Sequence, residues 1–374
     1  MAASGQMDVI IAGAGMAGVT LALGLASAGL KAVLIDPQPF EDQVQPTFDG
    51  RASAISFAAF RQWRALGAAP FLEPRAQRIE QILVTDGRSP GASRPPAGSA
   101  FLRFDSEEIA DRTDGEPLGY MLENRHIRAG LARAVGEAGI EVRAPARVVK
   151  VETLAGGARV TLEDGAVLTA PLVVGADSRG SIVRREAGIG TIGWDYGQAG
   201  VVATVALEHD HHGVAYEHFL PSGPFAILPL TDRRASLVWT ESAARGAALG
   251  DARPEVFAAH LGRRFGPFLG RLDAGGPRFV YPLSLQLAER LTAPRIALLG
   301  DAAHAIHPIA GQGLNMGLKD AAALAQVLTE AVRLGEDLGA ETVLERYGRW
   351  RRGGRERGRS GGRDERRTPP AAHP

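Results

Sequence analysis

Three aspartates stand where short apolar runs end, and each is placed to bind hydroxyl groups of a ligand. Asp36, Asp177 and Asp301 each follow a run of small and branched apolar residues. Such a run predicts a buried strand. A carboxylate at the end of a buried strand can accept hydrogen bonds from the hydroxyls of a sugar. The three positions therefore indicate a ligand that carries several hydroxyl groups.

Two glycine-rich turns add a second kind of chemistry, because glycines bring backbone N–H groups close to a ligand. In the first turn, Gly13, Gly15 and Gly18 follow the run Asp8–Ala12 and open a helical stretch. The first two glycines allow a tight turn and the close approach of a pyrophosphate, and the third lets the helix pack on the strand. Because Asp36 ends the next strand, this spacing predicts a dinucleotide site, although GxGxxG alone is equally typical of an ordinary turn.

The second turn contains Gly311 and Gly313, and helical periodicity follows from Leu314 to about Val332. The start of a helix presents free N–H groups and the positive end of the helix dipole. Together with Asp301, this helix start would suit a ligand that has both hydroxyls and a polarisable ring.

These segments resemble the flavin-dependent aromatic hydroxylases, the family related to p-hydroxybenzoate hydroxylase. Residues 300–320 resemble its GD…P…GQG…N…D motif, which holds the ribitol and isoalloxazine of FAD. Residues 49–51 resemble its DxR motif, and residues 175–181 resemble its GADG…S motif, with Ser178 where glycine is usual. The resemblance extends over nearly the whole chain and implies FAD as cofactor, with NAD(P)H as electron donor.

Within that family, the chain is most similar to the ubiquinone-biosynthesis group. The similarity is carried by residues 49–56, 123–125, 223–230 and 307–313. It implies that molecular oxygen hydroxylates the aromatic ring of a polyprenylated phenol through a flavin C4a-hydroperoxide. It also implies peripheral contact with the inner membrane and a ubiquinone-biosynthesis complex. Two alternatives stay open: another FAD aromatic hydroxylase or prenyl reductase of the same fold, and a non-catalytic flavin-binding subunit of that complex.

The resemblance also assigns roles to single residues. We expect the cofactor to contact Gly13, Ala14, Gly15, Met16, Gly18, Asp36, Arg51, Asn124, Arg128, Val148, Asp177, Gly300, Asp301, Pro308, Gly311, Gly313, Leu314 and Asn315. Pro308 and Gly313 are expected to position the flavin for catalysis, and no acid or base is assigned. Candidates for the substrate pocket are Phe219, Phe225, Leu228 and Pro229, each of which could equally be ordinary core of a sheet.

Composition excludes several classes of function. The 42 basic and 42 acidic residues give a formal net charge of zero, so there is no global case for nucleic-acid binding. The absence of cysteine excludes disulfides and thiolate catalysis. No apolar run approaches the ~20 residues of a membrane span, and no signal peptide is recognisable, so we expect a cytoplasmic protein. We assign no metal site, because His209, His211 and His212 have no further ligands nearby and favour a hairpin loop.

The pattern of elements predicts an α/β (α+β) protein with two interleaved domains. Glycine turns between apolar runs indicate a Rossmann-like FAD-binding domain with a parallel sheet. Alternating apolar and polar residues indicate a mostly antiparallel substrate-binding domain. The expected FAD-binding segments are 1–75, 120–182 and 288–350, and the expected substrate-binding segments are 76–119 and 183–287.

Two further expectations concern local structure. Val142–Val151 and Ala158–Leu162 read as a pair of strands, and Glu123–Val135 reads as a helix. Residues 351–374 are rich in Arg, Gly and Pro and have no apolar face, so we expect a disordered tail. Because the family continues with an amphipathic helix here, the loss of pattern after Trp350 favours a shifted reading frame over a basic arm for anionic lipid or nucleic acid.

Overall fold

The structure is a computed structural model that describes residues 7–40, 49–86, 102–109, 111, 114–266, 268–307 and 311–360. Two parts of the sequence-based expectations lie outside the described residues. These are Pro308 and residues 361–374.

One half of the molecule is built on a six-stranded sheet. All neighbouring strands in it run parallel except β19, which pairs antiparallel with β20. The strand order is β19 (Thr292–Ala293), β20 (Ile296–Leu298), β12 (Leu172–Gly175), β1 (Val9–Ala12), β2 (Ala32–Ile35) and β8 (Glu141–Arg143). The central strands are fully buried runs of apolar residues, as expected for a parallel sheet that is covered on both faces.

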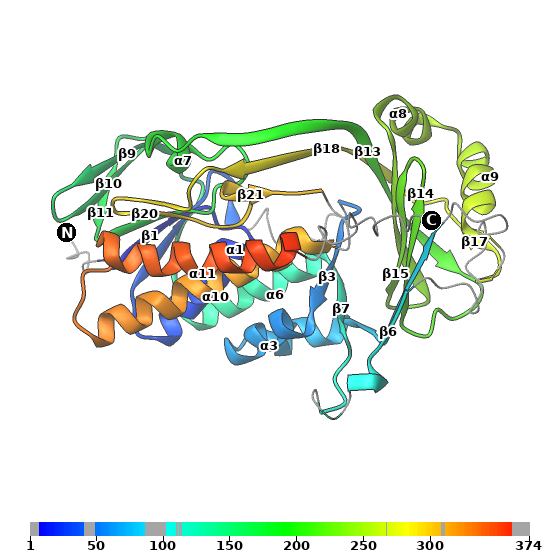
Figure 1. The fold of residues 1–374 in the computed structure, drawn as a ribbon, viewed down its shortest axis with the longest axis horizontal. Helices are drawn as coiled ribbons and strands as arrows, with labels where there is room; N and C mark the ends of the chain where they lie inside the picture. The colour runs from blue at the N-terminus through cyan, green and yellow to red at the C-terminus, as the bar shows by residue number, and fades with distance from the viewer. Residues whose placement is uncertain are drawn as a thin grey trace, which may run out of the picture.

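Helices cover one face of this sheet and a small second sheet covers the other (Figure 1). The helices are α1 (Met16–Ser27), α6 (Asn124–Glu137), α10 (Gln312–Arg333) and α11 (Glu341–Ser360). The small sheet is antiparallel and consists of β9 (Val148–Leu154), β10 (Gly157–Leu162) and β11 (Val167–Ala170), next to α7 (Ile182–Glu186). Side chains from all these layers join one hydrophobic core.

The other half is built on a nine-stranded sheet, whose long strands β13 and β18 reach across the top of the molecule in Figure 1. Its pairs are antiparallel except for β14 with β5. The order is β21 (His304–Ala305), β18 (Arg278–Ala288), β13 (Thr191–Leu207), β16 (Arg234–Ser242), β15 (Gly223–Leu230), β14 (Val214–Leu220), β5 (Gln81–Asp86) and β6 (Leu102–Asp105), with β17 (Leu272–Asp273) beside β13. Together, the parallel and antiparallel sheets confirm the predicted fold class.

The two faces of the nine-stranded sheet differ in what covers them. The outer face packs against α8 (Ala243–Asp251) and α9 (Pro254–Phe265), in a core that contains Phe225, Trp239 and Phe257. The inner face lies toward a three-stranded sheet of β3 (Ala52–Ser56), β7 (Gly119–Glu123) and β4 (Gln77–Ile79). Short helical elements accompany that sheet: α3 (Phe57–Ala65), α4 (Ala69–Leu72), η1 (Glu73–Arg75) and η2 (Glu107–Ile109).

Two local predictions are wrong. The strand expected at Val142–Val151 is two strands, β8 and β9, which belong to different sheets. Pro145 lies between them and cannot donate a ladder hydrogen bond, so it ends the first strand. The loss of helical structure expected from residue 351 does not occur there, because α11 continues to Ser360.

Candidate cofactor and substrate site

The topology of the six-stranded sheet gathers the predicted carboxylates and glycines at one edge. Strands β20, β12, β1 and β2 are neighbours in this order and run parallel. The residues within three positions after their ends are therefore neighbours too. From one end to the other these are Gly300 and Asp301, Asp177, the turn at residues 13–15, and Asp36. The carboxyl edge of an open parallel sheet is where such folds bind ligands.

In the first glycine turn, Gly13 and Gly18 are packed too closely for any side chain, whereas Gly15 faces open space. A Cβ on Gly13, whose φ is 108°, would lie 2.3 Å from the carbonyl oxygen of Ala176. A Cβ on Gly18 would lie 2.2 Å from the carbonyl oxygen of Gly13. A Cβ on Gly15 would meet no described atom within 4 Å. Since Gly15 also precedes α1 directly, the space in front of it faces the uncapped N–H groups of that helix.

Asp36 is held in place by two backbone donors. One carboxylate oxygen accepts from Ala14 N–H at 2.8 Å, and the other accepts from Gln38 N–H at 2.9 Å. Each oxygen keeps a further lone pair for a ligand hydroxyl. Val148 lies near this end of β2, because Ala146 N–H donates to the Asp36 carbonyl at 2.7 Å.

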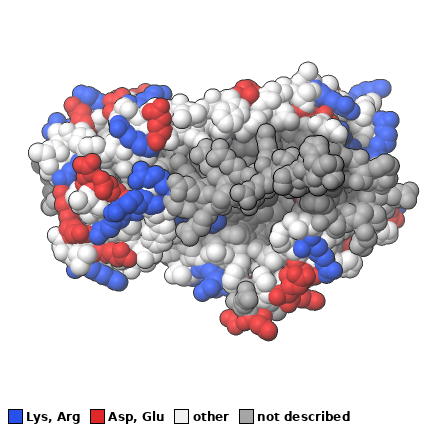
Figure 2. Space-filling model, in the orientation of Figure 1, with Lys and Arg blue, Asp and Glu red and all other residues white. Residues whose placement is uncertain are grey.

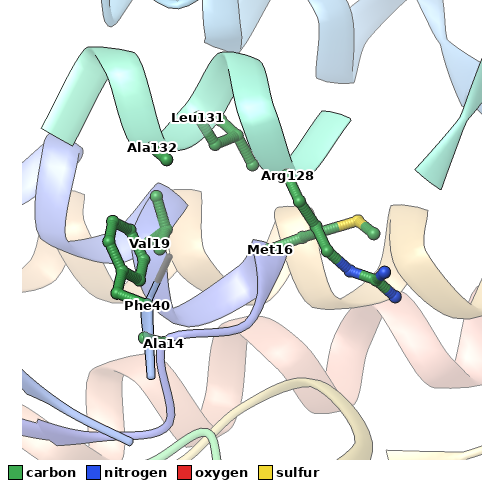
Figure 3. A pocket seen from close by; sticks show the side chains of 7 residues that line it. All are labelled: Ala14, Met16, Val19, Phe40, Arg128, Leu131 and Ala132. Carbon is green, nitrogen blue, oxygen red and sulfur yellow. The ribbon is translucent and has the colours of Figure 1, made fainter. Parts of the chain in front are cut away.

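A small pocket next to this turn is lined by residues of α1 and α6 and by Phe40 (Figure 3). Phe40 bounds one side of it, and Met16 and Arg128 lie at the other side. The remaining lining is apolar and comes from Ala14, Val19, Leu131 and Ala132. This pocket places three of the predicted contact residues, Ala14, Met16 and Arg128, beside the uncapped start of α1.

Among the described residues, one carboxylate oxygen of Asp177 has hydrogen-bond donors and the other has none. Oδ2 accepts from Ile182 N–H at 2.7 Å and Val183 N–H at 3.3 Å, and so fixes the start of α7. Oδ1 is buried and has no hydrogen-bond partner among the described residues. An unpaired buried oxygen is costly unless a ligand donor satisfies it. Ser178 adopts a φ of 63°, the left-handed conformation that glycine adopts without cost.

Asp301 follows Gly300 in the short helical turn η3 (Gly300–Ala302). Its side chain is exposed to solvent, yet burial by the surrounding protein raises the pKa of its carboxyl, and Arg179, His304 and Arg51 only partly oppose this. A carboxylate that solvent can reach but that protein atoms surround on most sides lines a recess rather than the open surface. The buried Arg184 joins this turn to the Asp177 turn by donating to Ala302 O at 2.8 Å and Arg179 O at 2.6 Å.

The N-terminus of α10 is open to a ligand in the part of the chain that the structure describes. Gly311, with a φ of 62°, begins the helix without a side-chain cap, and a Cβ on Gly313 would meet no described atom within 4 Å. Asn315 instead binds the protein itself, since its amide donates to Ala54 O at 2.6 Å and its oxygen accepts from Ser56 N–H at 2.9 Å. Its side chain therefore fixes the helix start on β3 and leaves only its backbone, like that of Leu314, for the cofactor.

Arg51, Arg128 and Asn124 come together around Asp49. Both arginines donate to Asp49, at 2.7 and 3.1 Å, and Asn124 N–H donates to Arg51 O at 2.9 Å. Burial alone would raise the pKa of Asp49, but the two arginines outweigh it and hold the pKa below its usual value. Tyr281 on β18, which sequence reasoning missed, donates to Asp49 O at 2.8 Å and faces the Arg51 guanidinium.

The structure divides the four pocket candidates between the two faces of the nine-stranded sheet. Phe219 is 40% exposed on the inner face, and Leu228 belongs to the cluster on that face. Phe225 is buried against Trp239 on the outer face, with ring centroids 5.7 Å apart. Pro229 lies on the same side as Phe225 because residues two apart in a strand share a face. Phe225 thus belongs to the outer core and Pro229 faces the same side, which corrects their assignment to a pocket.

A buried ionic cluster under Asp301 was also missed from the sequence. Asp320 of α10 is fully buried and lies 2.6 Å from His304 Nε2 and 2.6 Å from Arg351 Nε. The same carboxylate accepts from Gly300 N–H at 3.1 Å. Only the apolar periodicity of α10 could have hinted at it, since Asp320 falls on the buried face of that helix.

Comparisons with known proteins agree with this geometry. A family profile described as FAD binding domain matches residues 6–355. Ubiquinone hydroxylase UbiL of Rhodospirillum rubrum is 44% identical over 346 residues, which cover 92% of this chain and 77% of that protein. The 3-demethoxyubiquinol 3-hydroxylase of Escherichia coli is 35% identical over 348 residues, covering 91% and 84% of the two chains.

Solved structures show the same fold. The structure of PqsL, described as a probable FAD-dependent monooxygenase from Pseudomonas aeruginosa, matches with a TM-score of 0.75 and 26% identity, covering 93% of this chain and 92% of the other. The donor set at the sheet edge fits FAD, since the turn at residues 13–15 suits a pyrophosphate, the free Asp177 oxygen suits a hydroxyl and the α10 start suits an electron-rich ring. This chain therefore belongs to the FAD-binding-domain family and is an FAD-dependent hydroxylase.

Proposed function

We propose that the chain hydroxylates the aromatic ring of a polyprenylated phenol in ubiquinone biosynthesis, with FAD, NAD(P)H and molecular oxygen. The observation that carries this proposal is the alignment of Gly13–Gly15, Asp36, Asp177 and Asp301 along one sheet edge, opposite an apolar sheet face. The names of the relatives, ubiquinone hydroxylase and 3-demethoxyubiquinol 3-hydroxylase, supply the substrate class.

In this proposal each part of the site has a distinct role. When bound, FAD supplies the redox chemistry that transfers one atom of O2 to an aromatic ring at the expense of NAD(P)H. The uncapped start of α1 would hold the pyrophosphate, and Asp36 and Asp177 would accept from hydroxyls. Gly313, together with Pro308, would position the ring at the start of α10. Arg51, Arg128 and Asn124 would border the cofactor, and Val148 would border its adenine end.

The inner face of the nine-stranded sheet would hold the substrate. Its apolar side chains, Phe219 and Leu228 among them, would exclude water from the ring. This division of labour corresponds to a cofactor domain from residues 1–75, 120–182 and 288–350, and a substrate domain from residues 76–119 and 183–287. Strand pairing supports it, because β5 and β6 join the sheet of residues 191–288.

A polyprenylated substrate resides in a membrane, so we include peripheral contact with the inner membrane and membership of a biosynthetic complex in the proposal. Within the described ranges no helix is long and apolar enough to cross a bilayer. Two large apolar side chains on β13, Ile192 and Trp194, are 58% and 54% exposed and could contact lipid. On the face shown in Figure 2, acidic and basic side chains are mixed over the end that carries α10 and α11. That end therefore has no uniformly charged surface that would indicate a charged partner.

The proposal can be tested by oxygen incorporation with purified holoenzyme. With FAD, NAD(P)H, ¹⁸O₂ and a short-chain prenylated phenol, mass spectrometry should find one ¹⁸O atom on the aromatic ring. A product with a reduced prenyl double bond and no ¹⁸O would show a prenyl reductase instead. FAD binding without turnover of any phenol would support the non-catalytic subunit and contradict the proposal.

A further inference from the structure

Glu217 interrupts an otherwise apolar row that crosses the inner face of the nine-stranded sheet. Directly opposite residues in neighbouring strands lie on the same face, so the pairing register defines this row across seven strands. From β18 to β6 the row reads Phe279, Val202, Val238, Ala226, Glu217, Val84 and Leu102. Glu217 is its single titratable side chain.

The position of Glu217 relative to the flavin-binding helix follows from contacts. Ala215, two residues before Glu217 on the same face, belongs to a small cluster against which Ala54 of β3 packs. Ala54 is also the nearest neighbour of Gly311, since a Cβ on Gly311 would lie 3.2 Å from Ala54 Cβ. Two residues along a strand span ~7 Å. Ala215 and Ala54 form the packed layer between the nine-stranded sheet and the start of α10. Glu217 therefore lies next to this layer, one side chain further along β14.

The described surroundings of Glu217 contain nothing that explains a carboxylate there. Within the described part of the chain, its carboxylate has no hydrogen-bond donor and no cation as a partner, and burial is the one influence on its pKa. The apolar side chains of Leu102, Phe104 and Phe219 on the same face are 46%, 46% and 40% exposed. Glu217 is half-buried, and a carboxyl that is partly withdrawn from water without a partner is unfavourable, so a bound molecule is the natural candidate for its partner.

We propose that Glu217 is a catalytic residue that accepts the proton of the substrate's ring hydroxyl, and this rests on the function proposed above. The O–H bond of the phenol breaks and an O–H bond forms on a Glu217 oxygen. The electron pair of the broken bond stays on the substrate oxygen and enriches the ring carbons beside and opposite it. Those carbons are the positions at which an aromatic ring receives an electrophilic oxygen atom.

The strength of the base suits this proton transfer. Burial raises the pKa of Glu217 from 4.5 to about 7. That shift makes its carboxylate a roughly 300-fold stronger base than an ordinary glutamate, and it narrows the gap to the ~10 of a phenol such as tyrosine. A proton acceptor works best when its pKa lies near the working pH.

The first experiment compares turnover of the holoenzyme variants. Glu217→Gln keeps the shape of the side chain but removes the proton acceptor, and kcat should fall ~10²- to 10⁴-fold with FAD content unchanged. Glu217→Asp should retain part of the rate. Glu255→Gln, on α9 at the outer face, is the matched control and should leave kcat unchanged. A Glu217→Gln enzyme that keeps kcat within about threefold of wild type would overturn the proposal.

The second experiment does not depend on turnover. A short-chain prenylated nitrophenol ionises near neutral pH, and its phenolate gives a visible band in difference spectra of the oxidised holoenzyme. Because the bound probe and Glu217 share one proton near pH 7, the band should titrate in two steps in wild type and in one step in Glu217→Gln and Glu217→Leu. Glu217→Leu should also unfold at a higher temperature, so a gain in stability would accompany the loss of the second titration step.

These outcomes separate the two proposals. Wild type that oxidises NAD(P)H but never inserts oxygen into a phenol contradicts the proposed function, and the nitrophenol band then decides on Glu217 by itself. The same one-step titration of the band in wild type and Glu217→Gln shows that Glu217 does not take the proton, whatever the turnover.

Discussion

Arg351→Ala removes one partner of the buried Asp320 and should destabilise the whole cofactor half of the molecule. Asp320 is fully buried, and the Arg351 side chain beside it is 12% exposed. Breaking a buried ion pair from one side costs ~3–5 kcal/mol, because the remaining charge stays uncompensated. His304 and the Gly300 N–H group still contact Asp320, so we expect the lower end, about 3 kcal/mol. At ~2 °C per kcal/mol for a protein of this size, the unfolding temperature should fall by ~6 °C.

The assay is thermal unfolding of the holoenzyme, followed by circular dichroism and by release of flavin fluorescence. Arg349→Ala is the matched control, since Arg349 is exposed on the same helix and its loss should shift the unfolding temperature by less than ~1 °C. Asp320→Asn combined with Arg351→Met removes both charges, so the double variant should be more stable than Arg351→Met alone.

One result would refute this reasoning. If Arg351→Ala and Arg349→Ala unfold at the same temperature, Arg351 does not reach Asp320 and the helix after Trp350 contributes nothing to the cofactor half. Weaker FAD binding by Arg351→Ala alone would agree with our account, because Asp320 also holds the Gly300 turn.

The remaining predictions use the same assays. Ser178→Gly should raise the free energy of unfolding by ~1 kcal/mol because it relieves a left-handed φ, and Ser178→Ala should give no gain, so equal effects would speak against strain at this turn. Phe225→Ala should cost ~3–5 kcal/mol of stability, whereas Phe219→Ala should raise KM with little change in unfolding; the reverse pattern would contradict the assignment of faces. The raised pKa of Glu217 means that its native state holds a proton more tightly, so wild type and Glu217→Gln should be equally stable below pH ~4.5. As the pH rises from ~4.5 to about 7, wild type should lose ~3 kcal/mol relative to the variant, and parallel stability curves from pH ~4 to ~8 would rule this out.

The sheet edge could be predicted from the sequence because its signals are local. A buried strand, a glycine turn and a terminal aspartate lie within a few residues of one another at Gly13, Asp177 and Asp301. The parallel order of the strands then brings these short patterns together. Asn315 shows the limit of such patterns: its place in the motif suggested a cofactor contact, whereas its side chain is used to hold α10 on β3.

The inner face could not be predicted because it depends on strand register. Phe219 and Phe225 lie in similar apolar stretches, and only the pairing of β14 with β15 shows that they point to opposite faces. Glu217 and Tyr281 look like ordinary strand residues for the same reason. Arg351 was assigned to an aberrant tail because its partner Asp320 lies on another helix, and no local pattern links the two.

The strand order of the parallel sheet also determines when the protein can first acquire its cofactor during synthesis. The glycine turn after β1 and the Gly300 turn after β20 lie at one edge but 287 residues apart along the chain. At ~5–20 residues per second, the first turn leaves the ribosome roughly 15–60 s before Asp301 does. The nascent chain thus holds an open pyrophosphate turn with no ring-binding helix for most of its synthesis. Flavin capture is consequently a late event, and a cell short of FAD would accumulate finished chains that lack cofactor rather than stalled ones.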